Sequence, residues 1–165
     1  WGKACVKLYI MQHNARNSNK EDISVSIAVV YWSGTGNTEA MANAVAEGIT
    51  EAGGEAKLIP VSEANVDELA TESAFALGCP SMGVEVLEEE EMEPFVEALE
   101  SKVGGKNILL FGSYGWGDGE WMRNWVERMT NAGAFMVEEE GIIANEAPDD
   151  EVVEACKAGG RALVK

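Results

Sequence analysis

The stretch IAVVYWSGTGNT, residues 27–38, decides the fold of this 165-residue chain. Its first half is a β-branched and aromatic run, which predicts a buried strand. Its second half is a glycine-containing loop that leads into apolar residues at helical spacing, Met41, Val45 and Ile49. A buried strand, a short loop and a helix in this order are typical of a parallel sheet covered by helices.

The same alternation continues to the C-terminus. Further strands are predicted at residues 56–61, 74–79 and 107–112, and helices at residues 66–69, 91–103, 120–131 and 149–164. Residues 135–137 and 142–144 read as one last strand, interrupted by the acidic residues 138–140. Short links between alternating strands and helices place helices on both faces of the sheet. We therefore predict an α/β, three-layer doubly wound fold with five parallel strands.

The charge of the chain excludes several classes of partner. There are 29 Asp and Glu against 12 Lys and Arg, which gives a net charge of -17. Nucleic acids and anionic membranes repel such a surface, whereas basic proteins are attracted to it. No apolar run approaches the ~20 residues that a membrane span needs. We expect basic protein partners, no nucleic acid and no membrane.

Residues 1–26 differ from the rest of the chain. They carry four basic residues against two acidic ones, and residues 13–20 are polar without periodicity. We predict an N-terminal extension, linker or disordered, followed by a single domain over residues 27–165. The cysteines, Cys5, Cys79 and Cys156, form no CxxC pair, and His13 is the single histidine. This pattern disfavours a metal site and favours a reducing, cytoplasmic location.

The loop after the first strand has the chemistry of a phosphate cradle. Unpaired amides at a helix N-terminus, glycines and neutral hydroxyl donors all favour a bound anion. The loop lacks the lysine of a Walker loop, and Glu39 stands where a dinucleotide fingerprint needs its third glycine. With these two loop types excluded, the remaining candidate ligand is a terminal monophosphate. The alternative is a tight turn that caps the helix and binds no ligand. The predicted contacts are Ser33, Gly34, Thr35, Gly36, Asn37 and Thr38.

The loops after the third and fourth strands favour a flat ring. Trp116 lies between glycines, which leaves its indole prominent for stacking, and Met82 could pack on a ring face. A surface aromatic and an ordinary surface turn are the alternatives, whereas Trp121 and Trp125 read as core residues. A phosphate, a spacer and a planar polar ring together describe flavin mononucleotide (FMN). The predicted contacts are Met82, Gly83, Val84, Glu85, Ser113, Tyr114, Gly115, Trp116 and Gly117.

Three segments resemble the flavin-binding segments of the short-chain, clostridial type of flavodoxin. They are SGTGNT at residues 33–38, GCPSMGVE at 78–85 and FGSYGWGDGEWM at 111–122. The resemblance covers residues 27–165. It implies strand order 2-1-3-4-5, noncovalent FMN, and one-electron transfer between redox enzymes with no catalytic residue.

The resemblance also assigns roles at the ring. Met82 and Trp116 would lie on its two faces, Glu85 would accept from the pyrimidine N–H, and the Gly115 amide would donate to a ring carbonyl. The peptide between Gly83 and Val84 would reorient on reduction. Val84 departs from the small or polar residues usual at its place, and a β-branched residue disfavours positive φ. Pro80 stands where some relatives carry a hydroxyl.

These observations predict a low-potential one-electron carrier. A carboxylate about 10 Å from a reduced, anionic flavin costs that anion ~1.7 kcal/mol at an effective dielectric of about 20, and several acids follow the ring loops. The expected partners are redox enzymes with basic docking surfaces, such as ferredoxin- or flavodoxin-dependent reductases and oxidoreductases, and the expected state is a monomer. The alternatives are an FMN-dependent quinone reductase, an FMN-binding domain of a larger reductase, and a non-flavin phosphate-binding module.

Overall fold

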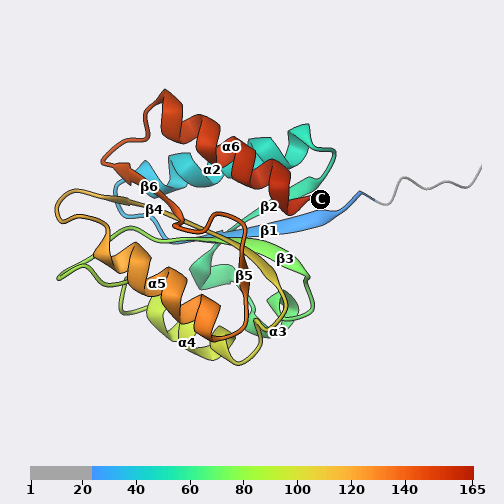
Figure 1. The fold of residues 1–165 in the computed structure, drawn as a ribbon, viewed down its shortest axis with the longest axis horizontal. Coiled ribbons are helices and arrows are strands. Elements are labelled where there is room, and N and C mark those ends of the chain that lie inside the picture. Colours follow the sequence, from blue (N-terminus) through green and yellow to red (C-terminus); the bar gives the residue numbers. More distant parts are fainter. Residues whose placement is uncertain (1–23) are drawn as a thin grey trace, which may run out of the picture.

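The computed structural model describes residues 24–165 (Figure 1). All but the last three residues of the predicted N-terminal extension, residues 1–26, lie outside this range. The strands are β1 (Ser26–Tyr31), β2 (Glu55–Pro60), β3 (Ala74–Gly78), β4 (Asn107–Tyr114), β5 (Phe135–Met136) and β6 (Ile142–Asn145). The helices are α2 (Asn37–Glu51), the 3-10 turn η1 (Val61–Glu63), α3 (Val66–Leu69), α4 (Met92–Glu100), α5 (Glu120–Asn131) and α6 (Asp150–Leu163).

The sheet has the predicted order, β2-β1-β3-β4-β5, and all its pairs are parallel. The fifth strand is split as the sequence indicated. Phe135 pairs with Asn107 at the start of β4, and Ile142 pairs with Phe111 farther along the same edge. Between the two pieces, Gly141 has φ +71° and residues 138–140 are exposed. Residues 138–140 therefore form an acidic bulge between β5 and β6, which together occupy one strand position at the edge of the sheet.

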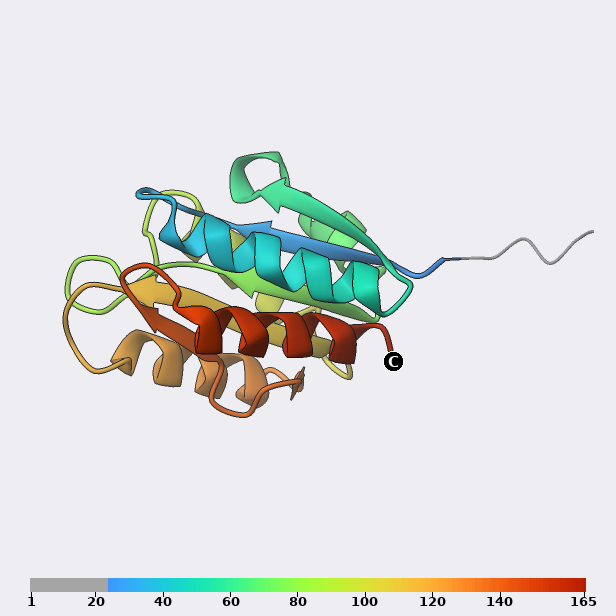
Figure 2. The same cartoon turned by 90° about the horizontal axis from the view of Figure 1, so that it is seen from above.

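Helices cover both faces of the sheet, which confirms the three layers (Figures 1 and 2). Helices α2 and α6 pack side by side on one face, while α3, α4 and α5 lie on the other. Strand β4 shows the origin of this arrangement, because its buried side chains alternate between two cores. Ile108 and Leu110 belong to the core under α4 and α5, and Leu109 and Phe111 to the core under α2 and α6.

Strand β4 is longer than predicted. The sequence suggested a strand ending at Gly112, but β4 continues through Ser113 to Tyr114. The cause is its partner, since β6 extends the ladder by pairing Ser113 with Ala144 and Tyr114 with Asn145. Two residues predicted in a loop thus stand on a rigid strand at the carboxyl edge of the sheet. Among the described residues, no helix has the length and apolar character needed to span a membrane.

Candidate functional site

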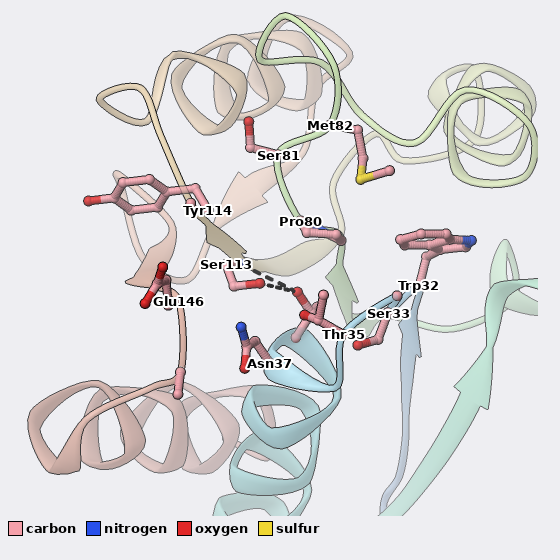
Figure 3. A pocket seen from close by; sticks show the side chains of 14 residues that line it. Trp32, Ser33, Thr35, Asn37, Pro80, Ser81, Met82, Ser113, Tyr114 and Glu146 are labelled. Atoms are coloured by element: carbon pink, nitrogen blue, oxygen red, sulfur yellow. Dashed lines mark hydrogen bonds between the residues drawn. The ribbon is translucent and has the colours of Figure 1, made fainter.

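A cavity of about 550 Å³ opens at the carboxyl ends of the strands, where ligands of doubly wound folds bind (Figure 3). Its walls come from the three predicted loops and from the segment between β6 and α6. The predicted residues that line it are Ser33, Gly34, Thr35, Asn37, Thr38, Met82, Ser113, Tyr114 and Gly115. Its other lining residues are Trp32, Pro80, Ser81, Glu146 and Ala147. No lysine, arginine or histidine is among the lining residues.

The first loop is folded around a serine hydroxyl. Ser33 Oγ accepts from the amides of Gly36 and Glu39, each at 3.2 Å. Gly36 is the residue before α2 and has φ +94°, a conformation that glycine adopts without strain. The first amides of α2 have no intrahelical acceptor. The loop therefore combines free amides with a positive helix dipole, as an anion cradle requires.

A buried pair of hydroxyls joins the first loop to β4. Thr38 Oγ1 and Ser113 Oγ lie 2.9 Å apart, and the Ser113 amide donates to Thr38 Oγ1 at 3.3 Å. Thr38 is only 1% exposed, although it lines the cavity. Its hydroxyl is thus held in one position at the base of the cradle.

The second loop is a tight turn closed by an antiparallel bridge. Met82 N donates to Val86 O at 2.8 Å, and Val86 N donates to Met82 O at 2.9 Å. Positive φ falls on Gly83 (+50°) and Glu85 (+54°). Val84 has no positive φ, so the strain expected from its β-branch does not arise in this conformation. Its side chain is 81% exposed at the tip of the turn.

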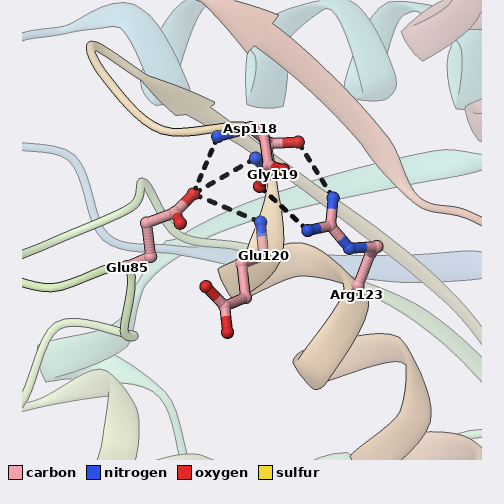
Figure 4. A network of polar contacts seen from close by, with 5 residues as sticks. All are labelled: Glu85, Asp118, Gly119, Glu120 and Arg123. Carbon is pink, nitrogen blue, oxygen red and sulfur yellow. Dashed lines mark hydrogen bonds and ion pairs between the residues drawn. The ribbon is translucent and has the colours of Figure 1, made fainter.

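Glu85 ties the second loop to the third (Figure 4). Its Oε1 accepts from the amides of Asp118, Gly119 and Glu120 at 3.1–3.2 Å, at the start of α5. A Cβ on Gly117 would overlap this carboxylate, so glycine is needed there for space as well as for its φ of +88°. On the other side of the loop, the hydrogen bond from Arg123 lowers the pKa of Asp118.

Six predicted site residues are not among the lining residues of the cavity: Gly36, Gly83, Val84, Glu85, Trp116 and Gly117. Trp116 is 62% exposed, as expected of a side chain available for stacking. Trp121 and Trp125 are buried core residues, as predicted, and Trp121 Nε1 donates to Cys79 O at 3.1 Å. Burial raises the pKa of the Cys79 thiol to about 12, so this cysteine beside the second loop is unreactive.

Sequence reasoning did not assign five of the lining residues to the site. The sequence predicts Trp32 as the last residue of a buried strand, and it places Pro80 and Ser81 in the second ligand-binding loop without assigning a contact to either. Glu146 and Ala147 come from a fourth segment, after β6, that no motif indicated. The usable signal was topological, because the last strand of a parallel sheet also ends at the ligand edge.

Glu88 is a structural cap, although it belongs to an acidic run. Its carboxylate accepts from the amides of Glu90, Glu91 and Met92 at 2.8–3.0 Å, at the start of α4. Burial opposes its ionisation, but these three hydrogen bonds outweigh burial and lower the pKa of the carboxyl. The neighbouring Glu89, Glu90 and Glu91 are exposed.

Glu88→Ala is expected to lower the free energy of unfolding by about 2 kcal/mol at pH 7, because it removes this cap. A lowered pKa adds stability above the unfolded-state pKa, and that stability is lost as pH falls through the folded-state value. The difference between parent and variant should therefore be constant near neutrality and shrink below about pH 4.5. Urea unfolding across this range tests it, with Glu90→Ala as the exposed control. A difference that grows in acid would contradict the capping role.

The cavity fits a ligand with a terminal phosphate and a flat ring. The cradle of amides and hydroxyls lies at the α2 end, and Met82, Tyr114 and the exposed Trp116 offer apolar surface at the other loops. The absence of a cation among the lining residues agrees with binding by amides alone. FMN has these features, so the residues present fit the cofactor expected from the resemblance.

Comparisons with known proteins agree with this geometry. The family model for flavodoxins matches residues 29–159. Flavodoxin of Clostridium beijerinckii is 51% identical over 135 residues, which cover 82% of this chain and 96% of that protein. Flavodoxin of Megasphaera elsdenii is 45% identical over 139 residues, 84% of this chain and 98% of that protein.

Solved structures give the same result. The solution structure of two-electron reduced Megasphaera elsdenii flavodoxin matches with a TM-score of 0.77 and 44% identity, and the match covers 84% of this chain and 98% of that one. The fold agrees with these likenesses, and the family model spans residues 29–159. The chain belongs to the flavodoxin family, the small FMN-binding electron carriers that serve redox enzymes and are not enzymes themselves.

Proposed function

We propose that this chain is a low-potential one-electron carrier that holds FMN in the cavity of Figure 3. The proposal rests on two features that occur together in one cavity. At the start of α2 there is an anion-binding loop with no basic side chain, and at the second and third loops there are apolar and aromatic side chains. Bound FMN supplies the one-electron chemistry.

The residues of the chain bind and orient the cofactor. Thr35, Asn37 and Thr38, with the loop amides and the hydroxyl proton of Ser33, donate to the phosphate. Met82 and Trp116 cover the ring faces, and the Gly115 amide donates to a ring carbonyl. Glu85 Oε2 accepts from the ring N–H, since Oε1 is occupied by the amides of α5.

Carboxylates around the ring loops make full reduction of the cofactor less favourable. Glu85 and Glu120 lie where the second and third loops meet, and the carboxylate of Asp118 beside them is paired with Arg123 (Figure 4). Glu89, Glu90 and Glu91 are exposed and follow the second loop. Each negative charge disfavours formation of a further anion nearby, and low local dielectric strengthens the effect. The low potential therefore arises from the combined charge of these carboxylates rather than from any one of them.

Thr38→Val is expected to weaken FMN binding by about 1–3 kcal/mol, or roughly 10- to 100-fold, because it removes a hydroxyl from the cradle. Riboflavin, which lacks the phosphate, should lose much less. Fluorescence titration of the apoprotein with both flavins measures the difference.

Ser113→Ala is the matched control, since it removes the partner of the Thr38 hydroxyl but leaves that donor in place. It should affect FMN less than Thr38→Val does. Equal losses for FMN and riboflavin in Thr38→Val would place the phosphate elsewhere.

Basic redox enzymes are the proposed partners, and a monomer in the cytoplasm is the proposed state. The support is the net charge of -17 and the acidic residues that follow the ring loops. Free, buried thiols at Cys79 and Cys156 fit a reducing compartment. The carrier is favoured over a domain of a larger reductase because the two flavodoxins are 51% and 45% identical to this chain. The matches also cover nearly the full length of both flavodoxins.

Replacing Glu89, Glu90 and Glu91 together by lysine is expected to slow electron transfer to a basic cytochrome by about tenfold at low ionic strength. The rate should also depend less on salt, because less attraction remains to be screened. Glu88 is left intact because it caps α4. Stopped-flow kinetics measure both effects, and lysines at Glu138, Glu139 and Glu140 provide the same charge change at another place. Equal effects of the two triple variants would remove the case for docking beside the second loop.

A further inference from the structure

Strand β2 leaves one edge of the sheet open. Among residues 24–165 it pairs only with β1, and it forms the margin of the sheet in Figure 2. The amide of Glu55 donates to Val25 O, which lies on the β1 side. Because the hydrogen-bonding direction alternates along a strand, the amides of Ala56 and Leu58 face away from β1. An edge of this kind is a template for a further strand.

The edge of β2 carries little of the protection that exposed edges usually have. Its register with β1 runs without interruption from the pair of Ser26 and Glu55 to the pair of Tyr31 and Pro60, so no bulge twists it away. Its only proline is its last residue, and the side chain of Leu58 is 41% exposed. Sheets that lack bulges and internal prolines at an edge commonly cover that edge with another segment.

A groove of about 100 Å³ lies beside this edge, on the face of the sheet that carries α3 and α4. Helix α3 has only four residues, so it covers β1 and β2 incompletely. The lining includes the apolar residues Val30, Ile59 and Leu69, the acidic residues Glu63, Glu68 and Glu72, and a single basic residue, Lys57. The groove is therefore complementary to a row of apolar side chains on a basic segment.

Residues 4–11, ACVKLYIM, have the pattern of such a segment. Val6, Leu8 and Ile10 alternate with Lys7 and Tyr9, which is the period of two that predicts a strand with one apolar face. Residues 1–23 also hold four of the 12 basic residues of the chain but only two of its 29 acidic residues. The segment thus has the charge that the rest of the chain attracts.

The connection to β1 is long enough and enters at the right end. Ser26, the first residue of β1, pairs with Glu55, the first residue of β2. A strand on the far side of β2 would lie two strand spacings, or ~10 Å, from β1. Residues 12–23 can span up to ~40 Å. A strand that ends at Met11 beside the start of β2 would run antiparallel to β2.

We propose that residues 4–11 add to the open edge of β2 as an antiparallel strand, with Val6, Leu8 and Ile10 over the groove. The sheet then has one more strand, and the outward amides of Ala56 and Leu58 gain acceptors. A second copy of the chain is a poorer occupant, because two copies that each carry a net charge of -17 repel one another. This inference goes beyond the proposed function and does not depend on the cofactor.

The test is amide hydrogen exchange, measured by NMR on the full chain loaded with FMN. Leu8→Asp places a charge over the apolar groove and beside its carboxylates, so it should release the strand. We expect the amides of Ala56 and Leu58 to exchange about tenfold or more slowly in the parent than in this variant. The amides of Lys57 and Ile59 face β1 and should exchange equally in both. Asn17→Asp, the same charge change within the polar residues 13–20, should behave as the parent does.

Two results would overturn the inference. Equal exchange of Ala56 and Leu58 in the parent and in Leu8→Asp would show that residues 4–11 do not cover the edge. Protection that increases with protein concentration would show that a second copy covers it instead. The visible absorption of bound FMN reports whether each variant is folded. If Leu8→Asp does not fold, Leu8→Ser gives the same comparison with a smaller change.

Discussion

Gly48→Ala is expected to lower the free energy of unfolding by about 3 kcal/mol. Gly48 lies in α2, and a Cβ there would overlap the carbonyl oxygen of Lys157 in α6. Gly160 makes the reciprocal approach, since its Cβ would overlap the carbonyl oxygen of Val45. The two helix backbones touch at these glycines, so added side chains must push the helices apart.

The sign of this effect is informative. In an unobstructed helix the same substitution stabilises by about 1 kcal/mol, because alanine has the higher helix propensity. Urea unfolding of the apoprotein measures the change. Gly104→Ala is the control, since the nearest atom to its Cβ would lie 4.0 Å away. A stabilising Gly48→Ala would show that α2 and α6 do not pack this closely.

Glu85→Ala is expected to lower the free energy of unfolding by about 2 kcal/mol and to weaken flavin binding by about 30-fold. The carboxylate accepts from three amides at the start of α5, and its loss leaves them without this partner. Flavin binding falls because the second and third loops lose the contact that sets their spacing. Urea unfolding and titrations with FMN and riboflavin measure both quantities.

The two flavins should lose equally in Glu85→Ala, because Glu85 joins the two ring loops and makes no contact with the phosphate cradle. Glu85→Gln keeps an oxygen acceptor for the amides and should recover most of the stability. A loss restricted to FMN would contradict this placement, and unchanged unfolding would contradict the cap.

Local patterns explain what could be predicted from the sequence. The first loop lies between a strand and a helix whose periodicities are both clear, so its position at the carboxyl edge followed directly. The interruption of the last strand at residues 138–140 was visible as an acidic run between two apolar pieces. Trp121 and Trp125 were recognised as core residues by their spacing of four.

Contacts between distant segments explain what could not be predicted. Ser113 and Tyr114 belong to β4 only because β6 pairs with them, and the pair of Thr38 with Ser113 joins residues 75 positions apart. Glu88 looked like its exposed neighbours until its carboxylate was seen to cap α4. Glu146 carries no motif, and its place in the cavity depends on the end of the last strand.

The most direct test of the account is a spectroelectrochemical titration of the holoprotein. The apoprotein should bind one FMN per chain, recover the visible absorption of an oxidised flavin, and take up electrons in two separate one-electron steps. The second step should occur well below the potential of free FMN, because carboxylates surround the ring loops. A protein that binds no FMN, or whose bound FMN is reduced at the potentials of the free cofactor, would contradict a low-potential one-electron carrier.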